Sequence, residues 1–172
     1  VGSSNRAMLT LADVSGLSRE EFVKRMNKKA LELGLRDARF TDPTGLDGGN
    51  GASPSDVALL LREALSQERI KNTLGLKEIT IRSRQKKSHH IWSTNWLLLG
   101  WIPSDLPRIV GGKTGFISAS GYNFAIVAGD DHGHTIEVII LGAKSHEARF
   151  TEARDAAKWV FENYDWPADT IK

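Results

Sequence analysis

The first third of the chain repeats its apolar residues at the spacing of an α-helix. Three helices are predicted there, over residues 4–14, 18–34 and 53–65. Ser18 and Glu21 have the spacing of a capping box at the start of the second helix, and Pro54 lies in the first turn of the third. Residues 40–53 contain one proline and four glycines, so an irregular loop is predicted between the second and third helices.

Beyond residue 78 the apolar positions alternate, which is typical of half-buried strands. Residues 78–82 form the first predicted strand, the polar run 82–90 an exposed turn, and Ile91 and Trp92 the returning strand. A single helical turn is predicted at 96–99, and three strands follow over 109–116, 122–129 and 135–141, the last two joined by a tight hairpin at 130–134. An amphipathic helix over 145–164 closes the chain. The pattern predicts an α+β fold with helices first and antiparallel strands later.

Composition narrows the class of protein without identifying it. The 172 residues suit one domain or a large part of one, with 40% hydrophobic and 26% charged residues. Cysteine is absent, which excludes disulfides and thiolate chemistry, and a net charge of +2 gives no indication of nucleic-acid binding. No stretch is long and apolar enough to span a bilayer, no secretory signal precedes Val1, and the chain starts without Met. We therefore expect a fragment or processed product whose parent compartment the sequence leaves open.

A Lys113-Thr114-Gly115 triplet on a predicted strand is the first candidate for chemistry. On an edge strand, Lys113 supplies a positive charge, Thr114 a hydroxyl donor for a carboxylate, and Gly115 room for a substrate backbone that adds as an extra strand. The backbone N–H of Phe116 is a candidate donor to a developing oxyanion. Taken alone, the triplet is more often an exposed lysine on a strand.

A Ser3-x-Asn5 pair at the start of the chain is the second candidate. Ser3 can pass a proton to a leaving amine, and Asn5 can orient a lysine base and a substrate amide. The alternative for this pair is an ordinary helix cap. Each motif is weak by itself, but their order in the chain is that of the penicillin-recognising serine acyl-transferases.

The motifs between and around these two give the pattern its specificity. The chain resembles the low-molecular-mass penicillin-binding proteins of the D-alanyl-D-alanine carboxypeptidase family over nearly its whole length. The resemblance rests on Met26-Asn27-Lys-Lys-Ala30, Leu33-Gly34-Leu35, Phe40-Thr-Asp-Pro-Thr-Gly-Leu46, Ser53 with Asp56, Thr94-Asn95 with Leu97-Leu98, Gly112-Lys-Thr-Gly115, Ser120-Gly-Tyr122, Leu141-Gly-Ala143 and Arg149-Phe150. It implies a penicillin-binding-protein/β-lactamase-like transpeptidase fold, an antiparallel sheet flanked by helices and incomplete at the N-terminus. Residues 1–75 would be its mostly helical part with Ser-x-Asn, and residues 76–172 its sheet part with Lys-Thr-Gly and the last helix.

The resemblance also implies an activity. The family consists of serine-type carboxypeptidases that trim peptidoglycan stem peptides ending in D-Ala-D-Ala through an acyl-enzyme, and β-lactams inhibit them as mimics of this donor. Here Lys113 would face the terminal carboxylate, and Arg149 would help to hold it. Such enzymes act outside the cytoplasm, in the periplasm or cell envelope. The resemblance implies neither a cofactor nor a metal.

One part of the family pattern has no counterpart in this sequence. The family places a nucleophilic Ser-x-x-Lys ahead of Ser-x-Asn, and only two residues precede Ser3. Ser83 and Lys86 match the spacing, but they follow Ser-x-Asn and lie in a predicted turn, so we interpret them as a chance match. We therefore expect these residues alone to be inactive. We also expect exposed apolar surface, satisfied by a homodimer, by exchange of elements between copies, or by a missing N-terminal segment.

Other readings of the sequence stay open. Within the same chemistry, the alternative is a D,D-endopeptidase that cuts cross-links; outside it, a non-catalytic peptidoglycan-binding relative or, more distantly, a cytoplasmic β-lactamase-like esterase. The histidines at 89–90 and at 132 and 134 are predicted to be solvated turn residues rather than metal ligands. Trp92, Trp96 and Trp101 favour a core or groove wall over a sugar-stacking platform. The basic run 82–87 is read as a solvated turn, with attraction to an anionic envelope surface as the alternative.

Overall fold

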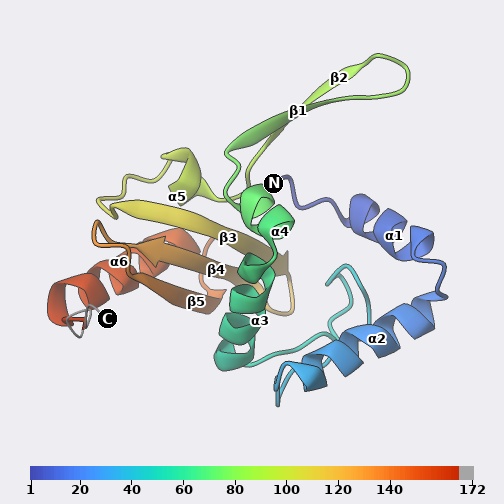
Figure 1. Ribbon diagram of the computed structural model, residues 1–172, viewed down its shortest axis with the longest axis horizontal. Helices are drawn as coiled ribbons and strands as arrows, with labels where there is room; N and C mark the ends of the chain where they lie inside the picture. The colour runs from blue at the N-terminus through green and yellow to red at the C-terminus, as the bar shows by residue number, and fades with distance from the viewer. Residues whose placement is uncertain (167–172) are drawn as a thin grey trace, which may run out of the picture.

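The computed structural model describes residues 1–166 and is built around a three-stranded antiparallel sheet (Figure 1). Its strands are β3 (Arg108–Ile117), β4 (Gly121–Gly129) and β5 (Thr135–Ala143), in the order β3-β4-β5. β4 is therefore central, and β3 has a free edge within the described residues. The register of β3 against β4 shifts between Ile109 and Gly111, which makes Val110 the extra residue of a β-bulge.

Helices cover both faces of the sheet, which explains the nearly continuous apolar run of β4. Phe124, Ile126 and Ala128 lie on one face, in a core with α5 (Trp96–Leu99) and α6 (Ala148–Asn163). Ala125 and Val127 lie on the other face, against α3 (Pro54–Ser66) and α4 (Glu68–Leu74). The expected inward face of the last helix is confirmed, because Phe150, Ala153 and Ala157 are fully buried and Val160 and Phe161 half-buried.

The N-terminal helices α1 (Asn5–Val14) and α2 (Arg19–Glu32) lie to one side of the sheet (Figure 1). The predicted capping box is present: the hydroxyl of Ser18 accepts from the N–H of Glu21, and the carboxylate of Glu21 accepts from the N–H of Ser18. Gly34 follows the helix with φ +76°, a left-handed conformation that favours glycine. In the loop beyond, Asn27 exchanges hydrogen bonds with the backbone of Phe40.

Asp56, in the first turn of α3, ties that helix to the chain that leads away from α2. Its buried carboxylate accepts the N–H groups of Arg36 at 3.0 Å and of Asp37 at 2.9 Å, and it completes a capping box with Ser53. Burial would raise the pKa of Asp56, but its hydrogen bonds together lower it. The carboxylate is therefore ionised where it holds the loop.

A two-stranded hairpin of β1 (Glu78–Arg82) and β2 (Ser88–Trp92) projects away from the sheet (Figure 1). The returning strand begins at Ser88, three residues before the Ile91 expected from the sequence. Polar residues such as Ser88, His89 and His90 hide the strand from a hydrophobic pattern because both faces of this hairpin are largely exposed.

The sequence missed one further element, α4, which the apolar pattern gave no reason to separate from the loop after α3. It lacks a side-chain cap at its N-terminus, and its start follows α3 after Gln67 alone. The last helix begins at Ala148 rather than near residue 145. The α+β architecture, with the antiparallel sheet flanked by helices, is as predicted. None of the helices in residues 1–166 combines the length and the apolarity that crossing a membrane requires.

Candidate active site

Lys113 lies on the free edge strand of the sheet, as the sequence predicts. It pairs with Ala125 of β4, and its ammonium group donates hydrogen bonds to Ser3 Oγ at 2.6 Å and to the backbone oxygen of Thr114 at 2.5 Å. Glycine is required just before it, because a Cβ on Gly112 would lie 2.7 Å from the backbone oxygen of Ala125. The strand can thus pack closely against β4 while the lysine faces the cleft.

Ser3 and Asn5 come from the start of α1. Ser4, not Ser3 or Asn5, caps the helix, because its hydroxyl accepts the N–H of Ala7. Ser3 precedes the cap with φ 48°, a left-handed conformation that is uncommon for a residue with a side chain. Its hydroxyl is thereby directed to Lys113. Asn5, the first residue of α1, lines the same cleft.

Thr114 is buried beside Lys113, and its hydroxyl hydrogen-bonds that of Thr94 at 2.8 Å. Thr94 lies in the segment before α5, so the pair connects β3 to the chain that follows the β1–β2 hairpin. Sequence reasoning singled out Thr94 as part of a family string but gave it no role in the site. Hydroxyl groups rotate freely, so the Thr114 donor can turn toward a ligand while Thr94 remains beside it.

Arg149, in the first turn of α6, also lines the cleft. It is 4% exposed, and its guanidinium donates to the backbone oxygen of Gly115 at 3.3 Å. The rings of Phe150 and Tyr122 lie 4.7 Å and 5.5 Å from the guanidinium carbon. Its Nε atom is buried without a hydrogen-bond partner among the described residues. Because Nε is closed off from the cleft, contact of the arginine with a bound anion has to come from its terminal amino groups.

Two cations share the site, and their charges act on each other. Lys113 remains reachable from solvent, yet burial of its ammonium group lowers its pKa, and the charge of Arg149 lowers it further. Burial also lowers the pKa of Arg149. An anion bound between them would relieve this repulsion, so the two charges suit the site to a carboxylate.

The cleft around these groups has a volume of about 610 Å³. It contains Ser3, Asn5, Lys113, Thr114, Gly115, Phe116 and Arg149, so the structure brings all the sequence-predicted site residues together. Phe116 is 52% exposed and stacks on Tyr122, with ring centroids 4.4 Å apart.

Aromatic residues form much of the cleft wall. Trp92, Trp96 and Trp101 line it, with the ring of Trp96 stacked on Phe150 at an interplanar angle of 11°. The groove-wall reading of these tryptophans thus agrees with their position. His146 also lines the cleft, 4.3 Å from the Trp96 ring, and burial followed by the charge of Arg149 lowers its pKa. The sequence gave no signal for this histidine, because it lies outside every motif.

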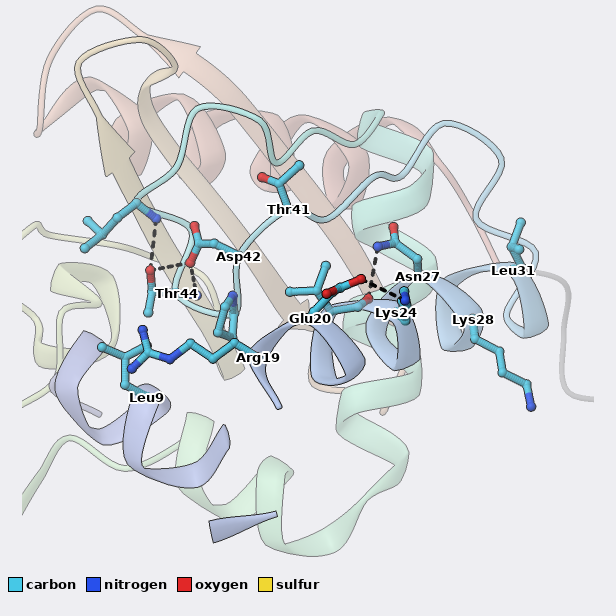
Figure 2. Close-up of a pocket in the computed structure, with 13 residues that line it drawn as sticks. Leu9, Arg19, Glu20, Lys24, Asn27, Lys28, Leu31, Thr41, Asp42 and Thr44 are labelled. Carbon is cyan, nitrogen blue, oxygen red and sulfur yellow. Dashed lines mark hydrogen bonds and ion pairs between the residues drawn. The ribbon is translucent and has the colours of Figure 1, made fainter. Parts of the chain in front are cut away.

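A larger hollow, of about 780 Å³, lies between α1, α2 and the loop after α2 (Figure 2). Figure 2 shows Asp42 hydrogen-bonded to Thr44 in that loop, and Glu20 in an ion pair with Lys24 on the surface of α2. This hollow contains none of the sequence-predicted site residues. The charged groups of α2 that line it are in ion pairs along the helix surface, and the Asp42 carboxylate is hydrogen-bonded within its own loop, so the smaller cleft is the better candidate.

Ser83 and Lys86 lie in the turn at the tip of the β1–β2 hairpin. The N–H of Lys86 donates to the backbone oxygen of Ser83, and Lys86 itself has φ 64° and is exposed. A serine and its lysine base need one helical face and a partly desolvated lysine, and this turn offers neither. The structure therefore agrees with a chance match.

Known proteins resemble this chain over most of its length. The family model described as D-alanyl-D-alanine carboxypeptidase matches residues 1–145. D-alanyl-D-alanine carboxypeptidase DacF of Bacillus subtilis is 32% identical over 166 residues, which cover 96% of this chain and 41% of that protein. D-alanyl-D-alanine endopeptidase of Haemophilus influenzae is 33% identical over 159 residues, 90% of this chain and 52% of that protein. The chain thus spans about half the length of these relatives or less.

A solved structure also matches in three dimensions. Penicillin-binding protein D2 of Listeria monocytogenes, in a cefotaxime-bound form, superposes with a TM-score of 0.76 and 29% sequence identity. The match covers 92% of this chain and 62% of that one. The fold is therefore that of the penicillin-binding proteins, as the sequence predicted.

Proposed function

Since the chain belongs to the D-alanyl-D-alanine carboxypeptidase family, we propose that it is part of a serine peptidase that removes the terminal D-alanine from peptidoglycan stem peptides through an acyl-enzyme. The observation that carries the proposal is the convergence of Lys113, Ser3 and Arg149 in one cleft, from β3, the start of α1 and α6. Residues so distant in the chain meet there around a space large enough for a peptide end.

In this proposal the two cations hold the substrate's terminal carboxylate. Arg149 is fixed by its contact with Gly115 O, and its terminal amino groups would donate to the carboxylate. Lys113 adds a second charge, and the Thr114 hydroxyl a neutral donor. The free edge of β3 can pair with the peptide backbone as an added strand, where Gly115 permits close approach.

Proton transfer is assigned to Ser3. Because Lys113 donates to Ser3 Oγ, the hydroxyl hydrogen of Ser3 is free to donate elsewhere. When the peptide C–N bond breaks, that hydrogen would pass to the leaving amine of D-alanine, and the Lys113 ammonium group, which already donates to Ser3 Oγ, would supply a proton to the serine oxygen in its place. Asn5 would orient the substrate amide, and the N–H of Phe116 would stabilise the oxyanion of the tetrahedral intermediate.

The nucleophile is proposed to lie in a Ser-x-x-Lys segment outside these 172 residues, so the chain alone would form no acyl-enzyme. Incubation with a fluorescent penicillin, followed by mass spectrometry of the intact protein, tests this directly. A covalent adduct on these residues would show that a serine of this chain is the nucleophile. The positive control is the longer coding sequence, if it encodes Ser-x-x-Lys upstream of Val1.

The activity itself is tested on that longer protein with a pentapeptide ending in D-Ala-D-Ala. Release of free D-alanine is expected, and Lys113→Gln should abolish most of it. An upstream sequence without Ser-x-x-Lys would instead favour a non-catalytic peptidoglycan-binding relative. By the same proposal the parent protein works outside the cytoplasm and is inhibited by β-lactams, for which the cefotaxime-bound relative gives support.

A D,D-endopeptidase is the second candidate, because one relative with 33% identity carries that name. The two activities would use the same site and differ in the amine that leaves when the peptide bond is cut: free D-alanine for a carboxypeptidase, and a second stem peptide for an endopeptidase. Digestion of cross-linked muropeptides separates them: loss of dimers indicates an endopeptidase, and release of D-alanine from pentapeptides a carboxypeptidase.

Whether the activity is that of a carboxypeptidase or an endopeptidase, we expect another part of the protein or a second copy to bury some exposed apolar side chains. Leu60 of α3, Ile70 of α4 and Leu141 of β5 line an apolar groove of about 410 Å³ beside Lys113. We expect a second copy or a further segment of the parent protein to cover such surface. Light scattering during size-exclusion chromatography tests for the dimer, and a monodisperse monomer would leave the additional segment as the explanation.

A further inference from the structure

The β1–β2 hairpin concentrates positive charge at its tip. Its four cations, all exposed, lie within residues 82–87: Arg82, Arg84, Lys86 and Lys87. No aspartate or glutamate occurs between residues 79 and 104 of the sequence. Within residues 1–166 none of the four cations is in an ion pair. Since the whole chain has a net charge of only +2, the tip is a local feature and not part of a generally basic surface.

One face of the same hairpin is apolar and open to solvent. The register pairs Ile79 with Ile91 and Ile81 with His89, which places these four residues on one face. Ile79 is 38% exposed and Ile81 47% exposed. Ile91 lies against the N-terminus, where its Cγ2 atom approaches Gly2. The apolar face is thus covered near the base and bare toward the cationic tip.

We propose that this hairpin docks on the surface of an anionic lipid bilayer. The four cations would lie among the lipid headgroups, and Ile81 would enter the boundary between headgroups and acyl chains. The exposed isoleucines favour a membrane over a soluble polyanion. A polymer of phosphates or carboxylates would attract the cations, but it has no apolar region in which an isoleucine side chain could be buried. This surface is separate from the proposed catalytic role and does not depend on it.

The hairpin would also place the cleft relative to the membrane. Trp92, the last residue of β2, lines the cleft. The segment after it is anchored by the buried Ser93 and Asn95 and by the Thr94–Thr114 hydrogen bond. The tip and the cleft are thus joined through a short and well-packed stretch of chain.

Flotation with lipid vesicles tests the proposal on the 172-residue protein. Binding is expected to vesicles that contain phosphatidylglycerol and not to vesicles of phosphatidylcholine alone, and it should weaken as salt is added. The triple variant R84Q/K86Q/K87Q should bind about a hundredfold more weakly, since each juxtamembrane cation contributes about fivefold. Equal binding to both kinds of vesicle would overturn the proposal.

Two further variants make the test specific. R25Q/R36Q/K71Q removes the same number of charges from exposed positions elsewhere and should lose far less binding. Ile81→Ser keeps every charge and should weaken binding to vesicles while leaving the far-ultraviolet circular dichroism unchanged. A soluble polyphosphate serves as competitor: if it binds as well as the vesicles and Ile81→Ser has no effect, the tip is a polyanion site and the lipid proposal is wrong. An equal loss in both triple variants would also overturn it.

Discussion

Lys113 Nζ donates a 2.6 Å hydrogen bond to Oγ of Ser3, a residue 110 positions earlier in the chain. This contact joins the sheet to the start of the N-terminal helices. It also sets the direction of the Ser3 hydroxyl in the cleft. The lysine makes the contact in a place where burial and a neighbouring arginine both disfavour its charge.

The pH dependence of the free energy of unfolding should show how much the charged form of Lys113 destabilises the folded protein. The pKa of Lys113 is lowered in the folded protein, whereas the unfolded chain keeps the proton up to about pH 10.4. Between these two values the unfolded state binds more protons, so the free energy of unfolding rises with pH. We therefore expect the stability of the wild type relative to Lys113→Met to increase as the pH rises from the lowered pKa of Lys113 toward about pH 10.

Urea unfolding of both proteins across that pH range provides the measurement. Titrating groups remote from Lys113 are common to the pair and cancel in the difference. The Val1 ammonium group, whose pKa is lowered by burial and also by the charge of Lys113, is acetylated in both proteins so that it does not contribute. Lys71→Met, at an exposed position of α4, controls for the loss of a lysine side chain as such. A stability difference that does not change with pH would contradict the role given to burial.

The carboxylate role of Arg149 is tested with two peptides. One ends in D-Ala-D-Ala with a free carboxylate, and the other has the same sequence with a C-terminal amide. Arg149→Gln should weaken binding of the acid about tenfold to a hundredfold, the worth of a hydrogen bond to a charged group. Binding of the amide should change little. Chemical-shift titration measures both affinities, and equal losses for the two peptides would assign Arg149 a structural role instead.

Asp56 should stabilise the fold in its charged form. Its pKa is lowered by hydrogen bonds that outweigh its burial, so its contribution is complete above about pH 4 and is lost as the pH falls through the lowered value. Asp56→Asn is expected to unfold at lower urea concentration than the wild type at pH 7. The difference should narrow in acid. Asp131→Asn, in the exposed β4–β5 turn, is the matched control and should show no such trend.

Phe150 should matter far more than another phenylalanine near the cleft. It is 0% exposed and lies against Phe124 and Trp96. Phe150→Ala should lower the free energy of unfolding by about 3–5 kcal/mol. Phe116→Ala, on the open face of β3, should cost about 1 kcal/mol, the worth of its stacking on Tyr122. Similar losses for both would mean that α6 does not depend on this core.

The sheet and most helices could be predicted because their signals are local. β4 has an apolar run bounded by Gly121 and Gly129, and Ser18 with Glu21 forms a cap that four adjacent residues specify. The early start of β2 could not be predicted, because its exposed residues follow no hydrophobic pattern. α4 was missed for a related reason: it is short, uncapped and without a fully buried residue.

In the candidate site, too, residues in local motifs could be predicted and residues placed by tertiary packing could not. Lys113 and Ser3 are found from motifs, and Arg149 from its place in the family order. His146 lies in the cleft only because α6 packs on the sheet and brings its preceding loop beside Trp96. That placement is a property of tertiary packing, and no spacing along the chain encodes it. The contact of Thr94 with Thr114 is likewise made by folding, across 20 positions.

The free edge of β3 exposes the protein to aggregation by strand pairing, and Lys113 helps to prevent it. An unpaired strand presents N–H and C=O groups to which a strand of any other molecule can attach, and folded proteins discourage this with charged side chains and bulges. β3 has both, in Lys113 and in the bulge at Val110. Under the proposed function this edge has to stay open for a peptide, and the charge and the bulge together disfavour its pairing with other copies of the chain. Replacing Lys113 would remove a charge from the cleft and, at the same time, make the folded protein more prone to aggregate through that edge.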